Sequence, residues 1–566
     1  MRLSDFLFCL LFLSCLHFLH ASFVNQPQYA GPDVPEGKLK SLSFAPFREG
    51  FSPLEKKFPL PEHIEEDLRL LADKTEAIRT YSSLGGMNIV PELARNHGMA
   101  MIQGAWLGYG KKDNRLEIDA LIESANAHPD VVNRVIVGNE VLLRGEMDPE
   151  RLIEYIREVK NAIGQPVSYA DVWSMYMKYP QIIREVDFIT IHILPYWEDE
   201  PIPVGTAPEH IERIYRQVRQ EADSIAPGKP ILIGESGWPS FGRQRGGAVP
   251  SVVNEALFIR QLLKTARDND FDYNIVEAFN QPWKSNLEGA VGANWGLYSA
   301  ARKQVFPLTG PVMENPDWMM RVLFSASLGL LVAFFYYRRL SALAWPKILV
   351  FLVFIQILAA SLFMPIDELW STAYSISRRV YVLLIAIVNT VTAGLLLQRG
   401  LAILTESHAS ARLAKWLDSV YLLLIALALY KTYGLATYGR YLDFPYAEFS
   451  LSVVGLIGLT VCSAFTVGKW VNVPPLCDLF GYSRAIANPR TIFYLLCFAV
   501  IALLAGETNA FMSGRDFIAA YPEMRRRLTN ALYYTLINRQ LLIWLGYLAL
   551  LAVFYYRNDR RSFSTK

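Results

Sequence analysis

A change in composition near residue 318 constrains the fold of this chain more than any other feature of its sequence. Up to about Trp318 charged and apolar residues are mixed, whereas from Met319 onward long apolar runs dominate. Seven of these runs approach the roughly 20 residues that a helix needs to cross a bilayer. They cover residues 319–337, 347–364, 380–397, 417–434, 450–469, 491–506 and 540–556. The sequence therefore predicts a polar domain followed by an all-α, multi-span membrane domain over residues 319–566.

Basic residues near the ends of the seven segments predict the orientation of the chain. If the segments alternate in direction, four groups of Lys and Arg fall on one side, which we expect to be the cytoplasm. The groups are Arg338, Arg339 and Lys347; Arg399, Arg412 and Lys415; Lys469, Arg484 and Arg490; and Arg557, Arg560, Arg561 and Lys566. Arg378, Arg379 and the arginines at 525–527 fall on the opposite side. The majority predicts an extracytoplasmic polar domain and a cytoplasmic C-terminus.

The first 21 residues are typical of a signal peptide or an N-terminal anchor. Arg2 gives a short basic start, and residues 6–19 form an apolar stretch of signal-peptide length. The tripeptide Leu19-His20-Ala21 matches a small-residue cleavage site poorly, so both interpretations stay open. Either one sends the chain from residue 22 onward across a membrane.

Composition argues against some partners and cofactors. The net charge of +2 gives no reason to expect nucleic acid or another polyanion as a partner. All five cysteines lie in apolar segments or their loops, and no CxxC or His/Cys cluster is present. We therefore predict neither a metal site nor a cofactor.

The polar domain, which we place at residues 38–312, alternates short apolar runs with amphipathic helical stretches. Eight strand candidates and at least seven helices match a (β/α)8 barrel, also called a TIM barrel. The clearest helices are expected at 89–97, 114–127, 148–163, 207–226 and 250–269. No eighth helix is evident, because 284–315 reads as a loop or a hairpin. A doubly wound open sheet is the alternative, but no Gly-rich phosphate loop follows the first strand.

Two of the strand candidates end on a carboxylate. The strand in "RVIVGNE" ends on Glu140, and the strand in "KPILIGES" presents Glu235. The carboxyl ends of barrel strands form the active face, so both side chains are expected to point into one bowl. Two acids suffice to cleave a glycosidic bond: one protonates the leaving oxygen, and the other attacks the anomeric carbon or activates a water.

The motifs around these glutamates carry a family resemblance. "VGNE" resembles the Asn-Glu acid/base motif of the large clan of retaining barrel glycosidases, and "GESGWPS" resembles the nucleophile motif of glycoside hydrolase family 17, the β-1,3-glucanases. The resemblance implies that Glu140 is the acid/base, that Glu235 is the nucleophile and that Asn139 binds the 2-hydroxyl of the sugar. Membrane-bound bacterial members of this family include glucosyltransferases acting on β-1,3/1,6-glucans. We therefore expect a multi-pass protein of a bacterial inner (plasma) membrane with a periplasmic catalytic domain.

Residues near the two glutamates are expected to control charge and to hold the substrate. Arg79, at the end of the second strand candidate, is expected to keep Glu235 ionised, and the charge of Glu235 is expected to raise the pKa of Glu140. Aromatic rings at strand ends offer flat apolar faces to sugars. Substrate contacts are predicted for Asn139, Arg79, Tyr81, Trp106, His192, Tyr196, Trp238, Phe279 and Trp283. Glu277 and Glu288 are candidates for secondary contacts, although a structural role is favoured for both.

Two classes of function remain open. The first is a membrane-tethered enzyme that cleaves β-1,3-glucan and then transfers or hydrolyses the released chain during glucan synthesis or remodelling. The second is a catalytically inactive β-glucan-binding module of a membrane synthase or export complex. The presence of both acids favours the enzyme. Seven spans exceed what an anchor needs, so a membrane glucan synthase is expected as a partner, besides the β-glucan substrate and the lipid bilayer.

Overall fold

The computed structural model of the protein describes residues 3–468, 473–483 and 485–564. Lys469, Arg484 and Lys566, which entered the topology prediction, lie outside the described residues. The chain divides into two compact units. One consists of Pro27–Glu314, and the other combines Met1–Gln26 with Asn315–Lys566.

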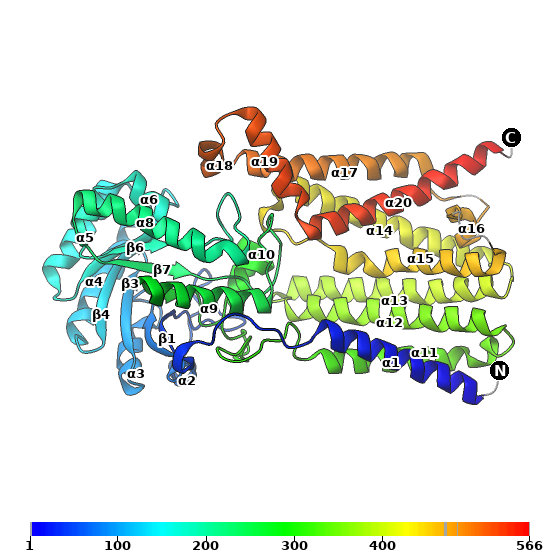
Figure 1. Ribbon diagram of the computed structural model, residues 1–566, viewed down its shortest axis with the longest axis horizontal. Helices are drawn as coiled ribbons and strands as arrows, with labels where there is room; N and C mark the ends of the chain where they lie inside the picture. Colours follow the sequence, from blue (N-terminus) through cyan, green and yellow to red (C-terminus); the bar gives the residue numbers. More distant parts are fainter. Residues whose placement is uncertain (1–2, 469–472, 484, 565–566) are drawn as a thin grey trace. The chain divides into compact units, whose positions relative to one another are not determined.

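Within Pro27–Glu314, all of which is described, the chain forms a closed barrel of parallel strands in the order β1 to β8 (Figure 1). β8 closes the barrel by pairing with β1, Ile275 opposite Leu42. The strands are β1 Leu39–Ser43, β2 Thr75–Arg79, β3 Ala100–Ala105, β4 Val132–Asn139, β5 Val167–Val172, β6 Ile189–His192, β7 Ile231–Ser236 and β8 Asp272–Ile275. Their interiors are almost entirely buried, as expected of a parallel sheet covered on both faces. The predicted barrel is confirmed.

Helices connect the successive strands and cover the outside of the barrel (Figure 1). They are α2 Pro61–Leu71, α3 Val90–Asn96, α4 Lys111–Ala127, α5 Pro149–Ala162, α6 Trp173–Lys178, α7 Ile182–Glu185, α8 Ala207–Ile225 and α9 Val252–Asn269. The start of α5 shows why local sequence sufficed to locate such elements. The side chain of Asp148 accepts a hydrogen bond from the backbone N–H of Arg151, and Pro149 occupies the first helical position.

A short helix, α10 (Ser285–Ala293), follows β8 where the sequence indicated only a loop or a hairpin. Gly289 interrupts it with a φ of 73° and a ψ of −172°. The second half of the segment is made of Gly, Ala and Val, so no amphipathic pattern marks it as a helix.

The second unit is helical. Among the described residues, eight helices are long and apolar enough to cross a membrane: the seven predicted segments and one at the N-terminus. They are α1 Leu3–Val24, α11 Trp318–Leu340, α12 Trp345–Ser371, α13 Ile376–Leu404, α14 Ala411–Tyr438, α15 Tyr446–Val467, α17 Pro489–Met512 and α20 Arg539–Ser564. Shorter helices are α16 Leu476–Phe480, α18 Arg515–Ala520 and α19 Met524–Leu536. The predicted all-α architecture of this half is confirmed.

The N-terminal helix α1 packs within this unit. Phe6 is fully buried and its ring lies 4.8 Å from that of Tyr337 on α11. Farther along, Gln356 of α12 hydrogen-bonds His17 over 2.7 Å. These contacts join α1 to α11 and α12 within the second unit.

Candidate active site

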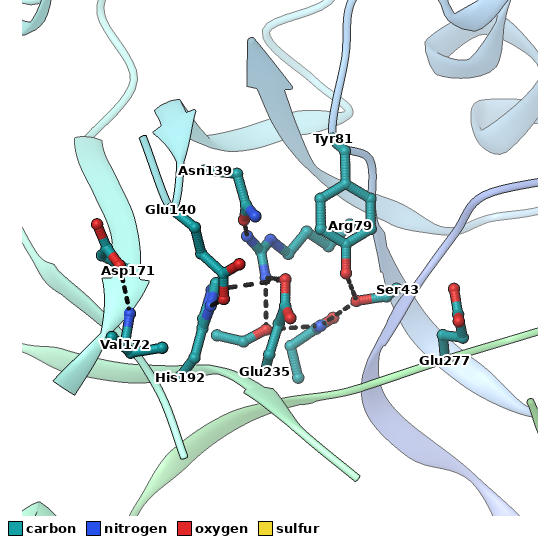
Figure 2. Close-up of polar contacts among 12 residues, drawn as sticks. Ser43, Arg79, Tyr81, Asn139, Glu140, Asp171, Val172, His192, Glu235 and Glu277 are labelled. Carbon is teal, nitrogen blue, oxygen red and sulfur yellow. Dashed lines mark hydrogen bonds and ion pairs between the residues drawn. The ribbon is translucent and has the colours of Figure 1, made fainter. Parts of the chain in front are cut away.

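The carboxyl ends of four strands bring five side chains into one cluster (Figure 2). They are Arg79 on β2, Asn139 and Glu140 at the end of β4, His192 on β6 and Glu235 on β7. One carboxylate oxygen of Glu140, one of Glu235 and a ring nitrogen of His192 all lie within 4.8 Å of one another. Closure of the barrel thus places both sequence-predicted acids in the same bowl.

The backbone at the end of β4 explains how a buried strand can present Glu140. The register between β4 and β5 shifts between Ile136 and Asn139, where the regular pairing ends. Gly138 has a φ of 86°, and Glu140 itself has a φ of 53°. The left-handed region is unfavourable for a residue with a Cβ, and residues held in it are enriched at active sites. This bend ends the strand and turns the carboxylate of Glu140 into the bowl.

Arg79 holds the cluster together from the floor of the bowl. The residue is only 1% exposed. Its Nη1 lies 3.2 Å from Oε1 of Glu235 and donates to the backbone carbonyl of Gly234 at 2.6 Å. Its Nη2 donates to Oδ1 of Asn139 at 2.6 Å. A fixed cation therefore stands against Glu235, and the same guanidinium orients the side-chain amide of Asn139.

His192 lies between the two glutamates. Its Nδ1 is 2.8 Å from Oε1 of Glu140, and its Nε2 is 3.5 Å from Oε1 of Glu235. Burial pushes the pKa of Glu140 upward, but the hydrogen bond and charge of His192, helped by Arg144 and Arg79, outweigh it and hold that pKa below its usual value. The raised pKa expected of Glu140 is therefore not found, because an imidazole stands between the two carboxylates.

The same three side chains could in principle ligate a metal ion. Within the part of the chain that the structure describes, Glu140, His192 and Glu235 form the one such group close enough to do so. The guanidinium of Arg79 contacts the oxygen of Glu235 that would be a ligand. This fixed positive charge repels a cation from the site, so we assign no metal to it.

The aromatic residues predicted to touch substrate differ in exposure. Tyr196, Trp238 and Phe279 are fully buried, so they form the support of the bowl and offer no free ring to a sugar. The hydroxyl of Tyr196 donates to the carbonyl of Arg243, and the indole of Trp238 donates to that of Val249. Aromatic residues from other parts of the chain pack against these rings, since Trp295 contacts Tyr196 and Phe258 contacts Trp238. A position at a strand end therefore does not by itself make a ring accessible.

Three of the predicted aromatic contacts are not fully buried. Tyr81 is partly buried: the guanidinium of Arg79 lies over its ring, and its hydroxyl donates to Ser43. Trp283 is partly buried, and Trp106 is 45% exposed. These side chains therefore fit the predicted contact role better than the buried rings do.

Glu277 and Glu288, the two candidates for secondary contacts, lie beyond the end of β8. Glu277 is buried and pairs with Lys284, whose Nζ lies 3.1 Å from Oε1 of Glu277. Burial raises the pKa values of Glu277 and Glu288, and the charge of Glu235 adds to both increases. Both carboxylates therefore interact electrostatically with Glu235. Glu277 follows β8 by two residues, so it stands at a strand end as Glu140 and Glu235 do.

Comparisons with known proteins give the site a context. Residues 42–296 match the family model of the BtgE/BtgC glycoside hydrolase domain. A glucan 1,3-beta-glucosidase from Arthroderma benhamiae is 26% identical over 268 residues, covering 45% of this chain and 86% of the relative. A protein of the same description from Schizosaccharomyces pombe is 28% identical over 243 residues, covering 40% and 75%. A crystal structure of a glycoside hydrolase family 17 beta-1,3-glucanosyltransferase from Rhizomucor miehei is 27% identical with a TM-score of 0.41, covering 47% of this chain and 95% of the other.

Proposed function

We propose that the protein is a retaining enzyme of glycoside hydrolase family 17 that cleaves β-1,3-glucan and passes the released chain to an acceptor sugar or to water; the match to the BtgE/BtgC glycoside hydrolase domain and the similarity to glucan 1,3-beta-glucosidases support this proposal. One observation carries the stereochemical part of this proposal: oxygens of Glu140 and Glu235 approach within 4.8 Å. Retaining pairs are separated by about 5–5.5 Å, whereas inverting pairs need roughly 6.5–9.5 Å to admit a water. The spacing supports direct attack by one of the glutamates.

In the first step Glu235 acts as the nucleophile. Arg79 stabilises its carboxylate, so that it can attack the anomeric carbon as the bond to the leaving oxygen breaks. Glu140 gives its proton to that oxygen. The 2.8 Å contact with His192 keeps a second proton-binding group within one hydrogen bond of the acid. The product of this step is a glycosyl ester on Glu235 and an ionised Glu140.

In the second step Glu140 acts as the base. It removes the proton from the entering hydroxyl, which attacks the same anomeric carbon and releases Glu235 as a carboxylate. Asn139, fixed by Arg79, is in place to hydrogen-bond the 2-hydroxyl in both steps. Two inversions at one carbon give net retention.

In our proposal the helical unit anchors the enzyme in a membrane. Eight helices among the described residues have the length and apolarity to span a bilayer. The distribution of Lys and Arg favours an orientation with the barrel outside the cytoplasm, and we place the protein in a bacterial inner membrane as part of this proposal. A tethered enzyme can act on glucan as it emerges from a synthase, which favours transfer and accounts for a membrane surface larger than an anchor requires.

Incubation of the detergent-solubilised full-length protein with laminari-oligosaccharides, followed by mass spectrometry, tests the proposal. We expect products both shorter and longer than the substrate. Glu235→Gln should abolish both, whereas Glu62→Gln, at an exposed position on α2, should not change them. If the unaltered protein binds the oligosaccharides but forms no product, it is the inactive glucan-binding module and not an enzyme.

A further inference from the structure

Two loops at the active end of the barrel expose large apolar side chains. Trp106 and Tyr109 follow β3, and Leu143 follows β4; their exposed fractions are 45%, 74% and 42%. Large apolar residues left exposed close together are characteristic of binding surfaces. The two loops are joined, since the hydroxyl of Tyr109 donates to the carbonyl of Gly145 at 3.4 Å.

Arg144 fixes Trp106 to the end of the catalytic strand. Its guanidinium lies over the indole at 4.5 Å from the ring centre. The same guanidinium donates to the backbone carbonyls of Asn139 and Leu107 and contacts Oε2 of Glu146 at 2.8 Å. One side chain thus connects the indole with the residue immediately before Glu140.

Glu117 fixes the loop after β3 from below. This buried carboxylate on α4 accepts hydrogen bonds from the backbone N–H groups of Trp106 at 3.3 Å and Ser83 at 3.1 Å, and from the hydroxyl of Ser82. The backbone that carries the indole is therefore ordered before any ligand arrives. Such preorganisation lowers the entropy that binding must remove.

The position of Glu140 indicates which part of a glucan would meet this surface. An acid that protonates the glycosidic oxygen lies on the side of the departing sugar, whereas the nucleophile lies below the anomeric carbon. Trp106, Tyr109 and Leu143 belong to the ends of β3 and β4, next to Glu140, while Glu235 lies on β7. The surface therefore borders the leaving-group side of the bond that is cleaved.

We propose that Trp106, Tyr109 and Leu143 form the platform for the departing and the entering sugar, and that this platform selects a glucan acceptor over water. The inference rests on the proposed function and specifies where its acceptor binds. A sugar ring stacked on Trp106 would hold its hydroxyl beside Glu140 in the second step, where Glu140 removes the proton. An empty platform would leave that place to water and give hydrolysis.

A donor without a leaving sugar distinguishes the role of the platform from that of Glu140 and Glu235. With β-laminaribiosyl fluoride the leaving group is a single atom, so glycosylation of Glu235 needs no sugar on the platform. Full-length protein in detergent would be given this donor and increasing laminaribiose, with fluoride release and transfer product measured together. Trp106→Ala should raise the acceptor concentration for half-maximal transfer by roughly tenfold more than it lowers fluoride release.

Two further variants keep the result interpretable. Tyr109→Ala changes the most exposed of the three positions and serves as a second test if Trp106→Ala fails to accumulate. It should also raise the acceptor concentration for half-maximal transfer. Tyr29→Ala, an equally exposed aromatic that precedes β1, should change neither quantity. Equal losses of fluoride release and transfer, or unchanged acceptor use in Trp106→Ala and Tyr109→Ala, would overturn the platform. Absence of any fluoride release by the unaltered protein would overturn the proposed function instead.

Discussion

The Nδ1 atom of His192 lies 2.8 Å from Oε1 of Glu140, and the side chain of His192 is completely buried. This contact joins the ends of β6 and β4 and places a titratable ring against the proposed acid/base. It is the principal reason that the pKa of Glu140 is lowered despite its burial.

Replacing His192 by Asn should move the alkaline limb of the pH profile of kcat/KM to higher pH. The acid must be protonated to donate, so activity is lost as the pH rises through the pKa of Glu140. Without His192 the effect of burial dominates and this pKa rises, although Arg79 and Arg144 still oppose it. Initial rates on laminari-oligosaccharides across a pH series give the measurement. His210 is a buried histidine on α8, so His210→Asn serves as the control and should leave the alkaline limb at the same pH. An alkaline limb that stays at the same pH or moves to lower pH in His192→Asn contradicts the prediction.

Replacing Arg79 by Lys should lower kcat/KM by about two orders of magnitude. Lysine keeps the charge but cannot bind Glu235, Gly234 and Asn139 at once, and misplacement of reacting groups by about 1 Å costs on the order of 10²-fold. Steady-state kinetics and thermal unfolding would be compared. Arg260→Lys serves as the matched control, since Arg260 is also 1% exposed but lies on α9. The prediction fails if both variants lose activity to the same extent.

Azide rescue should assign the two glutamates. Glu140→Ala should slow cleavage of unactivated glucan by roughly 10²–10⁴-fold, because acid and base assistance are both lost. With a dinitrophenyl leaving group the glycosyl ester still forms, and azide then releases it as a β-glycosyl azide. Glu235→Ala should instead give the α-azide by a single inversion. Nuclear magnetic resonance distinguishes the two products, and an α-azide from Glu140→Ala would reverse the roles.

The N-terminal helix should remain in the mature protein. Phe6 packs against Tyr337, and His17 bonds Gln356, so removal of α1 would expose apolar surface on α11 and α12. The intact mass of the purified membrane protein should therefore include residues 1–24. A mass corresponding to a start at residue 22 would show that the leader is cleaved.

The barrel should lie outside the cytoplasm and the C-terminus inside. Alkaline phosphatase folds to an active form only after export, so a fusion after Asp317 should be active and a fusion after Lys566 inactive. The physical basis is the excess of Lys and Arg on one side of the predicted spans. The opposite pattern of activity would require a different number of spans.

Local patterns in the sequence were enough to predict the barrel, the membrane helices and the two glutamates. Helical and strand periodicities extend over a few residues, and a bilayer-spanning segment is recognised by its length and apolarity alone. The motifs around Glu140 and Glu235 are contiguous, and the barrel topology places all strand ends on one face. None of these features depends on which residues come into contact in the folded protein.

Burial and electrostatics were decided only by the tertiary structure, because both depend on distances between segments far apart in the chain. The pKa of Glu140 was expected to be raised, but His192 lowers it. His192 is 52 residues away in the sequence and lies on a different strand. Tyr196, Trp238 and Phe279 stand at strand ends like Trp106, yet packing buries the first three and leaves Trp106 exposed. The sequence by itself therefore determined which groups could do chemistry, whereas the three-dimensional packing determined their charge and their access to substrate.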